Sequence, residues 1–195
     1  GQAGNFSDLI ELLLENEYTI YSFDGPSHGF SSKGSTSLFE FTELVGVLIK
    51  KHNIKTLISH SFGGVATTYA LFNNPDLFIE KYILITTPDK FIERIDDVSE
   101  MVGITQKVKT RLIERLQNET GIDVRTLNVS DFVKTINVKK SLIIHDKNDK
   151  VIPIERSKNV HQNWTVSEFE IVEGTGHFRI LRTKAVLDKV VDYLS

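Results

Sequence analysis

The sequence predicts an α/β fold with an open, mainly parallel sheet, and three observations indicate it. Strand-like and helix-like segments alternate along the chain, which is typical of a parallel sheet covered by helices. The segment "KTLIS" lacks polar alternation, as a strand buried on both faces does, and "KYILIT" has the same character. A length of 195 residues fits one domain with a substantial core. We therefore expect a single domain over residues 1–195.

The first half of the chain alternates helix and strand around a loop. Apolar residues at helical spacing predict a helix over about residues 6–15, and "EYTIYSF" predicts a strand that ends at Asp24. A loop rich in Gly, Pro and Ser follows. Ser37 and Glu40 form a capping-box pattern that opens the next helix. Its expected buried face consists of Leu38, Phe41, Leu44, Val45 and Leu48. "KTLIS" is the next strand, and the helix after it ends before Pro75.

The second half contains a charged helical insertion between two strands. "KYILIT" and "SLIIHD" predict the strands, and residues 90–138 between them contain no convincing strand. Thr105 and Gly121 are the expected caps of one helix in this insertion. Its shared apolar face would comprise Val108, Leu112 and Leu116. "EFEIV" predicts a last strand, and residues 183–194 a closing helix. Because ligands bind at the carboxyl ends of parallel strands, the insertion can act as a lid there or can simply pack.

Composition excludes several classes of function. The formal net charge of −3 is at odds with a nucleic-acid-binding protein, which needs a clustered basic surface. No apolar run approaches the ~20 residues of a membrane span. The absence of cysteine excludes disulfides, zinc–thiolate sites and thiol catalysis. With no signal-peptide pattern visible, we expect a cytoplasmic protein, and the sequence does not predict its oligomeric state.

The stretch "SHSFGG", residues 59–64, lies where a strand gives way to a helix. Ser61 is flanked at alternate positions by the small residues Ser59 and Gly63, which is the pattern of a nucleophile elbow with serine in place of the first glycine. Such a turn exposes the serine hydroxyl, and the Phe62 N–H at the following helix N-terminus can stabilise an oxyanion. Taken alone, the motif fits a serine N-cap in a tight turn equally well.

Two further residues at strand ends argue against a mere turn. Asp149 lies a few residues past "SLIIHD", and His177 lies in the Gly-rich loop after the last strand. A serine nucleophile needs a base of near-neutral pKa, and that base needs an acid to fix its tautomer. The order Ser–Asp–His, with each residue at a strand end, therefore indicates nucleophilic catalysis.

With these residues in view, the sequence resembles the α/β-hydrolase superfamily over nearly its whole length. "YSFDGPSHGFSS" resembles that family's loop after strand four, with Ser27 where glycine is common. "GTGHFRILRTKAVLDKVVDYL" resembles one group of bacterial hydrolases of undefined substrate. The resemblance implies that Ser61 is the nucleophile, His177 the general base and Asp149 the orienting acid. It also implies a small helical cap near residues 90–138.

Asp146 competes with Asp149 for the role of the acid. Asp146 directly abuts its strand, whereas Asp149 has the family's spacing to Val151 and Pro153, so we favour Asp149. His145 beside Asp146 could suggest a metal site, but no third ligand has suitable spacing, and we expect no metal. The remaining candidates are expected to pack, to face solvent or to pair with neighbours rather than to catalyse: Asp24, His28, His52, His60, His161 and Arg179.

The same resemblance implies that the N-terminal strands of the fold precede this sequence. "GQAGNF" resembles the segment that follows the family's strand three and its His-Gly loop, which supplies the second oxyanion donor. We therefore expect a longer full protein, with "TIYSF" and "TLISH" as the neighbours of the missing strand.

The expected function is that of a serine esterase or thioesterase that acts on a small-molecule acyl substrate and needs no cofactor. Two alternatives stay open at this point. One is a non-catalytic binding protein on the same scaffold, although such a protein has no need of the three residues. The other is a cofactor-free acyltransferase or perhydrolase, which would use the same residues with an acceptor other than water.

Overall fold

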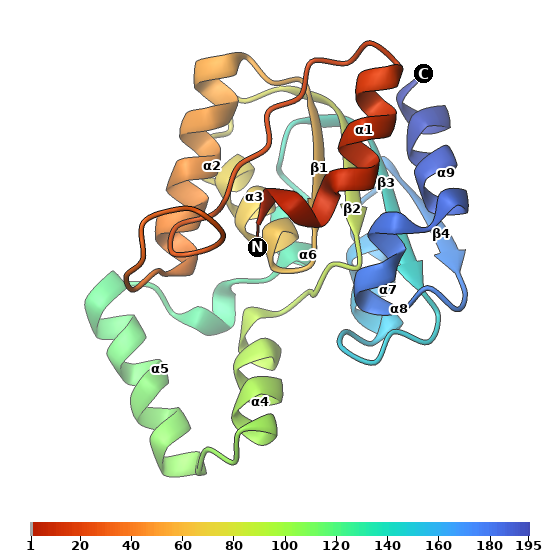
Figure 1. Cartoon of the computed structure of the whole chain (residues 1–195). Helices are drawn as coiled ribbons and strands as arrows, with labels where there is room; N and C mark the ends of the chain where they lie inside the picture. The colour runs from red at the N-terminus through yellow and green to blue at the C-terminus, as the bar shows by residue number, and fades with distance from the viewer. Residues whose placement is uncertain (1) are drawn as a thin grey trace.

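The computed structural model describes residues 2–195 and contains one four-stranded sheet with helices on both faces (Figure 1). The strands are β1 (Thr56–His60), β2 (Ile79–Ile85), β3 (Val138–Asp146) and β4 (Ser167–Val172), in the order β1-β2-β3-β4. Every neighbouring pair is parallel. The predicted fold class, an open parallel α/β sheet, is thereby confirmed.

Alternate residues of the central strands pack against two separate helical layers. Ile83 and Ile85 of β2 lie in a core with α1 (Ser7–Glu15) and α9 (Lys184–Leu194). Tyr82 and Leu84 lie in the opposite core. That core is formed with α2 (Leu38–His52), α3 (Phe62–Phe72), α6 (Val129–Phe132) and α7 (Ile154–Gln162). The remaining elements are η1 (Ala3–Phe6), α4 (Phe91–Met101), α5 (Gln106–Thr120), η2 (Val124–Thr126), α8 (Gly176–Arg179) and η3 (Ile180–Arg182).

Helix α2 begins where its sequence predicts. The Ser37 side chain accepts a hydrogen bond from the Glu40 N–H, which satisfies one of the free donors of the first turn. Asn53 closes the helix in the left-handed conformation, with φ 49°. On the expected buried face, Leu38, Phe41 and Val45 are buried, whereas Leu44 and Leu48 are half-buried.

The strand predicted for "EYTIYSF" is wrong, because residues 17–23 form no strand. The segment is extended, but its side chains alternate between the two helical layers without any sheet partner. Ile20 packs on the α1/α9 core, while Phe23 packs on the α2/α3 core. A strand exists only when a neighbour accepts its backbone hydrogen bonds, and none of the described residues lies beside this segment in that way.

Strand β1 is also less buried than its apolar sequence led us to expect. Thr56 is exposed, and only Ser59 of its five residues is fully buried. By contrast, the last six residues of β3 are all buried. The difference arises because β1 has a paired neighbour on one side only among residues 2–195.

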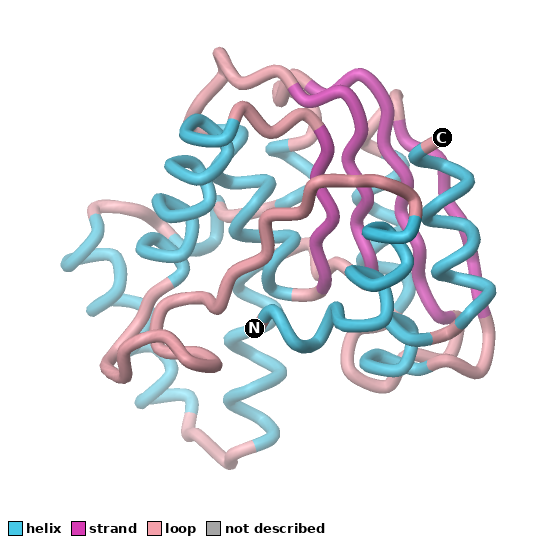
Figure 2. The backbone as a smooth tube through the Cα atoms, turned by 45° about the horizontal axis from the view of Figure 1, so that its top comes forward, coloured by secondary structure: helices cyan, strands magenta, loops and turns pink. Residues whose placement is uncertain are grey.

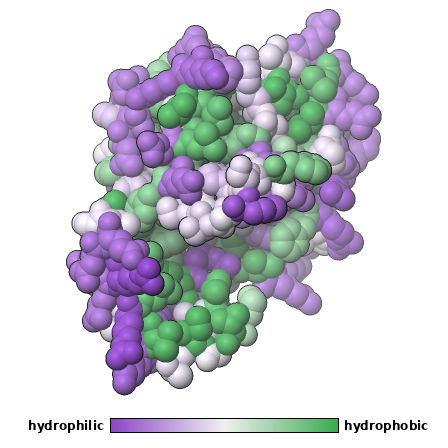
Figure 3. Space-filling view, turned by 60° about the vertical axis from the view of Figure 1, so that its left-hand side comes forward, coloured by the Kyte–Doolittle hydropathy of each residue, from purple (hydrophilic) through white to green (hydrophobic). Residues whose placement is uncertain are grey.

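The predicted helical insertion projects beyond the carboxyl ends of the strands as the α4–α5 hairpin (Figure 1). Gly121 ends α5 with φ 71°, as predicted, while the Thr105 side chain makes no cap hydrogen bond. Of the apolar face expected on α5, Val108 and Leu112 are exposed and Leu116 is half-buried against the core, while Ile113 is the buried residue of this helix. Apolar side chains gather on this projecting part of the surface (Figure 3).

Polar contacts attach α4 to the sheet's helical layer. Arg156 of α7 donates two hydrogen bonds to the Asp97 carboxylate, at 2.6 and 3.0 Å, and lies 3.1 Å from Glu93. The pKa of Asp97 is lowered because it accepts these bonds and lies beside Arg156. Among residues 2–195, no helix has the length and apolar character needed to cross a membrane.

Candidate active site

Ser61 occupies a strained turn between β1 and α3. Its backbone has φ 54° and ψ −128°, a region that side-chain-bearing residues rarely adopt. The Ser61 N–H donates to the Ile85 carbonyl of β2 at 3.0 Å, which fixes the turn to the sheet. The strand's end thus holds the serine in place while the positive φ turns its side chain out of the sheet.

Gly64, rather than Gly63, is the glycine that the turn needs for space. A Cβ at Gly64 would lie 2.9 Å from Leu84 Cδ2 and 2.9 Å from Thr87 Oγ1, whereas a Cβ at Gly63 would meet no atom within 4 Å. Gly63, the small residue of the elbow pattern, is therefore not needed to prevent a clash. At Ser59, the small side chain is buried and hydrogen-bonded to the Tyr82 hydroxyl at 2.9 Å.

The structure brings Ser61, His177 and Asp149 together in one hydrogen-bonded line. The Ser61 Oγ lies 3.1 Å from His177 Nε2, and the His177 Nδ1 lies 2.8 Å from Asp149 Oδ2. A carboxylate can only accept, so Nδ1–H donates to Asp149 and Nε2 is free to accept the serine proton. Ser61 lies 116 positions before His177 in the sequence and Asp149 lies 28 positions before it, yet the three side chains form a connected proton path.

Asp149 is held as an anion. Burial raises the pKa of this carboxyl, but hydrogen bonds from His177 and from the Ile152 and Val151 N–H groups outweigh burial and leave the pKa below its usual value. The N–H donors lie 3.0 and 2.7 Å from Oδ1, so Oδ2 is left for His177. One oxygen thus fixes the loop and the other orients the imidazole.

Asp146, the alternative candidate for the acid, has a different role from Asp149. Its Oδ2 accepts hydrogen bonds from the Thr175 N–H, the Thr175 hydroxyl and the Gly176 N–H, at 2.6, 2.8 and 2.9 Å. Its Oδ1 accepts from the Asn148 N–H at 2.8 Å. Asp146 therefore clamps the loop that carries His177 to the end of β3, and it does not contact the imidazole itself.

His60 contributes to the site in a way that the sequence did not reveal. Its Nε2–H donates to the His177 carbonyl at 2.8 Å, and the two rings lie 4.8 Å apart. Burial, followed by the nearby His177, lowers the pKa of His60 to about 4. The ring is therefore neutral near pH 7 and holds the backbone of His177 from the strand that also carries Ser61.

His145 supports the loop of the acid. It is fully buried, lies 2.9 Å from the Ile152 carbonyl through Nε2, and lies 2.6 Å from the Ser157 hydroxyl through Nδ1. Burial lowers its pKa. Its Nε2 also lies 3.7 Å from Asp149 Oδ2, and no group of three or more potential metal-binding side chains occurs among residues 2–195.

The other candidates lie outside the hydrogen-bonded line. Asp24 accepts from the Phe30 and Ala3 N–H groups, which lower its pKa. His28 Nδ1 contacts the Pro26 carbonyl, and Arg179 donates to the Thr175 and Gly174 carbonyls. His52 and His161, expected at the surface, are half-buried, because each stacks on an aromatic ring: His52 on Tyr21 and His161 on Phe169.

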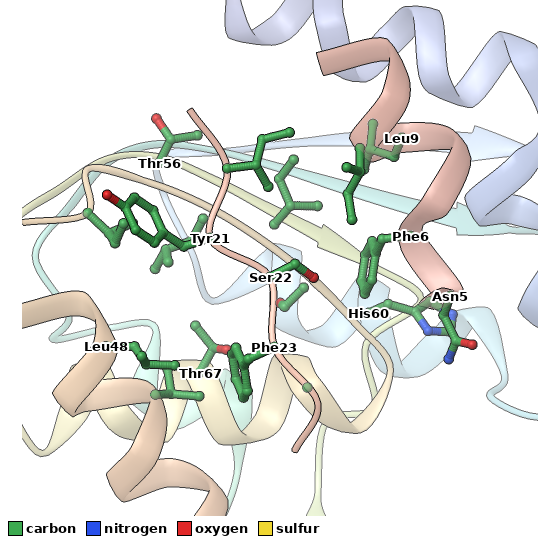
Figure 4. Close-up of a pocket in the computed structure, with 18 of the residues that line it drawn as sticks. Asn5, Phe6, Leu9, Tyr21, Ser22, Phe23, Leu48, Thr56, His60 and Thr67 are labelled. Atoms are coloured by element: carbon green, nitrogen blue, oxygen red, sulfur yellow. The ribbon is translucent and has the colours of Figure 1, made fainter. Parts of the chain in front are cut away.

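A largely apolar cavity of about 420 Å³ opens beside the serine (Figure 4). Ser61, Phe62 and His177 line one end of it, together with Asn5 and Phe178. Phe62 is the first residue of α3, so its N–H has no acceptor within the helix and is free for a ligand oxygen. The second oxyanion donor was expected from residues that precede this sequence, and its position stays a prediction. No residue of the α4–α5 hairpin lines the cavity.

Comparison with known proteins identifies structures of the same fold but no relative of similar sequence. No protein-family model matches the chain, and no curated protein matches it. Solved structures match nearly its whole length. An esterase from Exiguobacterium antarcticum superposes with a TM-score of 0.77 at 21% identity, covering 99% of this chain and 87% of the esterase.

Two further structures agree with this match. A lipase-esterase related protein from Clostridium acetobutylicum ATCC 824 gives a TM-score of 0.71 at 19% identity, covering 98% of this chain and 89% of its own. An alpha/beta hydrolase from a Medee basin deep-sea metagenome library gives 0.74 at 15% identity, covering 100% and 85%. Identities this low establish a common fold and leave the activity to the site itself. From the open parallel sheet, the strand-to-helix turn at Ser61 and these superpositions, the chain has the α/β-hydrolase fold.

Proposed function

We propose that this chain is a serine hydrolase that cleaves a carboxylic ester or thioester through an acyl-enzyme intermediate. The observation that carries the proposal is the connected line from Ser61 Oγ through His177 to Asp149, with contacts of 3.1 and 2.8 Å. The strained backbone of Ser61 supports it, because a serine that merely capped a helix would not need φ 54°.

In the first half of the reaction, Ser61 Oγ attacks the acyl carbon and its proton passes to His177 Nε2. The carbonyl oxygen becomes an oxyanion, toward which the Phe62 N–H and the N-terminus of α3 are directed. The imidazolium then gives its proton to the leaving alcohol or thiol as the bond to the acyl carbon breaks. Asp149 stays ionised and stabilises the imidazolium, since its pKa lies below the usual value.

In the second half, water replaces the leaving group. His177 Nε2 accepts a proton from water, and the resulting hydroxide attacks the acyl carbon of the Ser61 ester. The same proton returns to Ser61 Oγ as the carboxylic acid leaves. The apolar cavity next to Ser61 favours an uncharged acyl group as substrate. The cytoplasmic location expected from the sequence stays part of the proposal.

Labelling with a fluorophosphonate, followed by peptide mass mapping, tests the proposal. We expect modification of Ser61 in the wild-type protein, none in Ser61→Ala, and strongly slowed labelling in His177→Ala. Ser59→Ala is the matched control, because Ser59 lies in the same turn but its hydroxyl bonds to Tyr82 rather than to His177. Hydrolysis of an aryl ester and of an acyl thioester is measured on the same samples.

The outcomes separate the alternatives. A folded protein without label on Ser61 would contradict the proposal and favour a non-catalytic binding protein. Label on Ser61 with ester turnover only in the presence of an added alcohol or peroxide would identify an acyltransferase or perhydrolase instead.

A further inference from the structure

His145 is a fully buried histidine that the proposed reaction does not use. It lies directly before the last residue of β3, and the loop that follows β3 lies at the same end of the sheet as the loop that carries His177 (Figure 2). Its Nε2 lies 3.7 Å from Asp149 Oδ2, the oxygen that also lies 2.8 Å from His177 Nδ1. One carboxylate oxygen of the catalytic acid therefore faces two imidazole rings.

The contacts of His145 fix its neutral tautomer. The Ile152 carbonyl lies 2.9 Å from Nε2 and can only accept, so the single ring proton of the neutral form is on Nε2. On the other side of the ring, Nδ1 lies 2.6 Å from the Ser157 hydroxyl, whose oxygen lies 3.0 Å from the Thr87 carbonyl. The neutral ring therefore has no proton on the side that faces Ser157.

With His145 neutral, these contacts are one proton short. Ser157 has one hydroxyl proton and two neighbours that can accept it, namely His145 Nδ1 and the Thr87 carbonyl. Thr87 is buried, and no other donor to its carbonyl occurs among residues 2–195, so losing the Ser157 proton is costly there. An imidazolium removes the conflict, because Nδ1–H then donates to Ser157 and the Ser157 hydroxyl donates to Thr87.

The surroundings of His145 act on that additional proton in opposite directions. Asp149 and Asp146 favour it, whereas burial and the nearby His177 and His60 oppose it. Burial outweighs the other influences and lowers the pKa of His145, so the ring is neutral near pH 7 and gains the proton in acid. Helix α7, which also packs on β3, directs its arginine to the carboxylates of α4 instead.

We propose that His145 is a positioning residue that sets how much of the Asp149 charge is available to His177. With His145 neutral, Asp149 stabilises the imidazolium that forms when His177 takes the Ser61 proton. With His145 protonated, the same oxygen has a second cation 3.7 Å away, so it stabilises the His177 imidazolium less and acylation slows. The inference rests on the proposed serine hydrolase activity.

Nuclear magnetic resonance of the histidine ring nitrogens tests the proton positions without using activity. The sample is the whole chain labelled with ¹⁵N-histidine and titrated from about pH 8 to about pH 5. We expect His145 to carry its proton on Nε2 at the start and to gain a second proton on Nδ1 as the pH falls. Asp149→Asn should weaken this second proton binding by at least about tenfold, because it removes the counter-charge.

A pair of serine variants isolates the contact at Nδ1. Ser157→Ala removes the acceptor of the second proton, so we expect proton binding at His145 to weaken by about tenfold. Ser167→Ala is the matched control, because Ser167 lies 2.7 Å from His161 Nδ1 and forms a second serine–histidine pair outside the site. It is expected to alter the titration of His161 and to leave that of His145 unchanged.

The effect on catalysis is measured as the pH dependence of kcat/KM for hydrolysis of an aryl ester. His145→Gln keeps an amide N–H for the Ile152 carbonyl but cannot take up a proton. Over the acidic range in which circular dichroism shows both proteins to be folded, kcat/KM of the wild type should fall more than about tenfold per pH unit, because two histidines gain protons. The variant should fall by about tenfold per pH unit at most, because His177 alone then titrates.

Each readout can overturn the proposal. A His145 proton on Nδ1 rather than Nε2 at high pH, a ring that stays neutral until the protein unfolds, or a titration that Asp149→Asn leaves unchanged would contradict the assigned contacts. An equally steep loss of kcat/KM in His145→Gln would show that His145 does not act on catalysis. Absence of the fluorophosphonate label on Ser61 would instead refute the proposed function, and the ring titration would still decide the proton positions.

Discussion

The two aspartates that follow β3 divide their tasks between His177 and its loop. Asp149 bonds to the imidazole, whereas Asp146 accepts four hydrogen bonds from backbone and hydroxyl groups around it. Substitution of each aspartate by neutral asparagine is therefore expected to remove a different interaction. At Asp149 it removes the charge that stabilises an imidazolium, and at Asp146 it weakens a structural clamp.

We expect Asp149→Asn to lower kcat for ester hydrolysis by about 10³–10⁴-fold while the protein stays folded. The reason is that an asparagine amide can hold His177 in the wrong tautomer and carries no charge. Asp146→Asn is expected to cost about 1–3 kcal/mol in the free energy of unfolding, because its N–H partners lose an acceptor. Urea titration and initial rates measured on both variants check the two halves. A larger loss of kcat in Asp146→Asn than in Asp149→Asn would show that the acid is Asp146.

The sequence identified the candidate catalytic residues but not the residues that hold them in place. Ser61, Asp149 and His177 carry local signals, namely an elbow pattern, a spacing to Pro153 and a Gly-rich loop. His60 and His145 carry none, because their partners are carbonyls and hydroxyls of residues brought near by the fold. Only the parity of His60, opposite to that of Ser61 along the strand, hinted that it would point elsewhere.

Among the elements, the contact of α3 with the sheet depends on a single glycine. Gly64→Ala would bring a methyl group within 2.9 Å of both Leu84 and Thr87, so we expect a loss of about 1–3 kcal/mol in the free energy of unfolding. Gly63→Ala is the matched control one residue away, where a Cβ meets nothing within 4 Å. We expect that change to be neutral or to stabilise α3 by up to about 1 kcal/mol. Equal losses in the two variants, seen in denaturant titrations, would argue against this packing account.

Helix α4 depends on Arg156 for its attachment. The paired hydrogen bonds to Asp97 and the contact with Glu93 are charge-assisted but partly exposed, so we expect Arg156→Ala to weaken the docking of α4 by about 1–2 kcal/mol. Amide exchange within α4 should then accelerate by about 5- to 30-fold, while exchange in β2 and β3 stays unchanged. Arg156→Lys keeps the charge but loses the paired geometry, and an intermediate acceleration is expected. Unchanged exchange in the alanine variant would mean that apolar contacts alone hold α4.

Helices and central strands were predictable because their signals are local. The cap at Ser37 marks the start of α2, and the apolar run of β3 marks a buried strand. Neither signal depends on residues distant in the sequence. The strand predicted for residues 17–23 was wrong for the opposite reason, because a strand requires a paired neighbour, which the local sequence pattern does not identify. On α5, the spacing of Val108 and Leu112 predicts a shared face but not its burial, and both residues are exposed because the hairpin projects from the sheet.

For the whole molecule, buried neutral histidines link stability to pH. The pKa of His60 falls from 6.5 to about 4 on folding, and that of His145 falls as well. The unfolded chain therefore binds more protons than the folded one between these values, so stability is full above pH 6.5 and falls as pH drops toward 4. Asp146 and Asp149, whose pKa values are lowered, lose stability in the same direction but only below about their usual pKa of 3.8.

We expect His60 alone to contribute up to about 3 kcal/mol of this loss between pH 6.5 and pH 4. Urea titrations of the wild-type protein and of His60→Asn at both pH values measure it. The variant should be less stable at pH 7, because the His177 carbonyl loses a donor, yet its stability should depend less on pH. A variant with the full pH dependence of the wild type would assign the effect to other groups.

The two ends of the helical insertion meet. Lys90 and Asn128 form an antiparallel bridge, and the Phe91 N–H donates to the Leu127 carbonyl at 2.9 Å. Everything between them is a closed excursion of the chain that leaves the sheet and returns to the same point. A change in the length of the α4–α5 hairpin therefore leaves the distance between its two anchoring points unaltered, whereas the core still depends on Ile113, Val124 and Leu127 within the excursion.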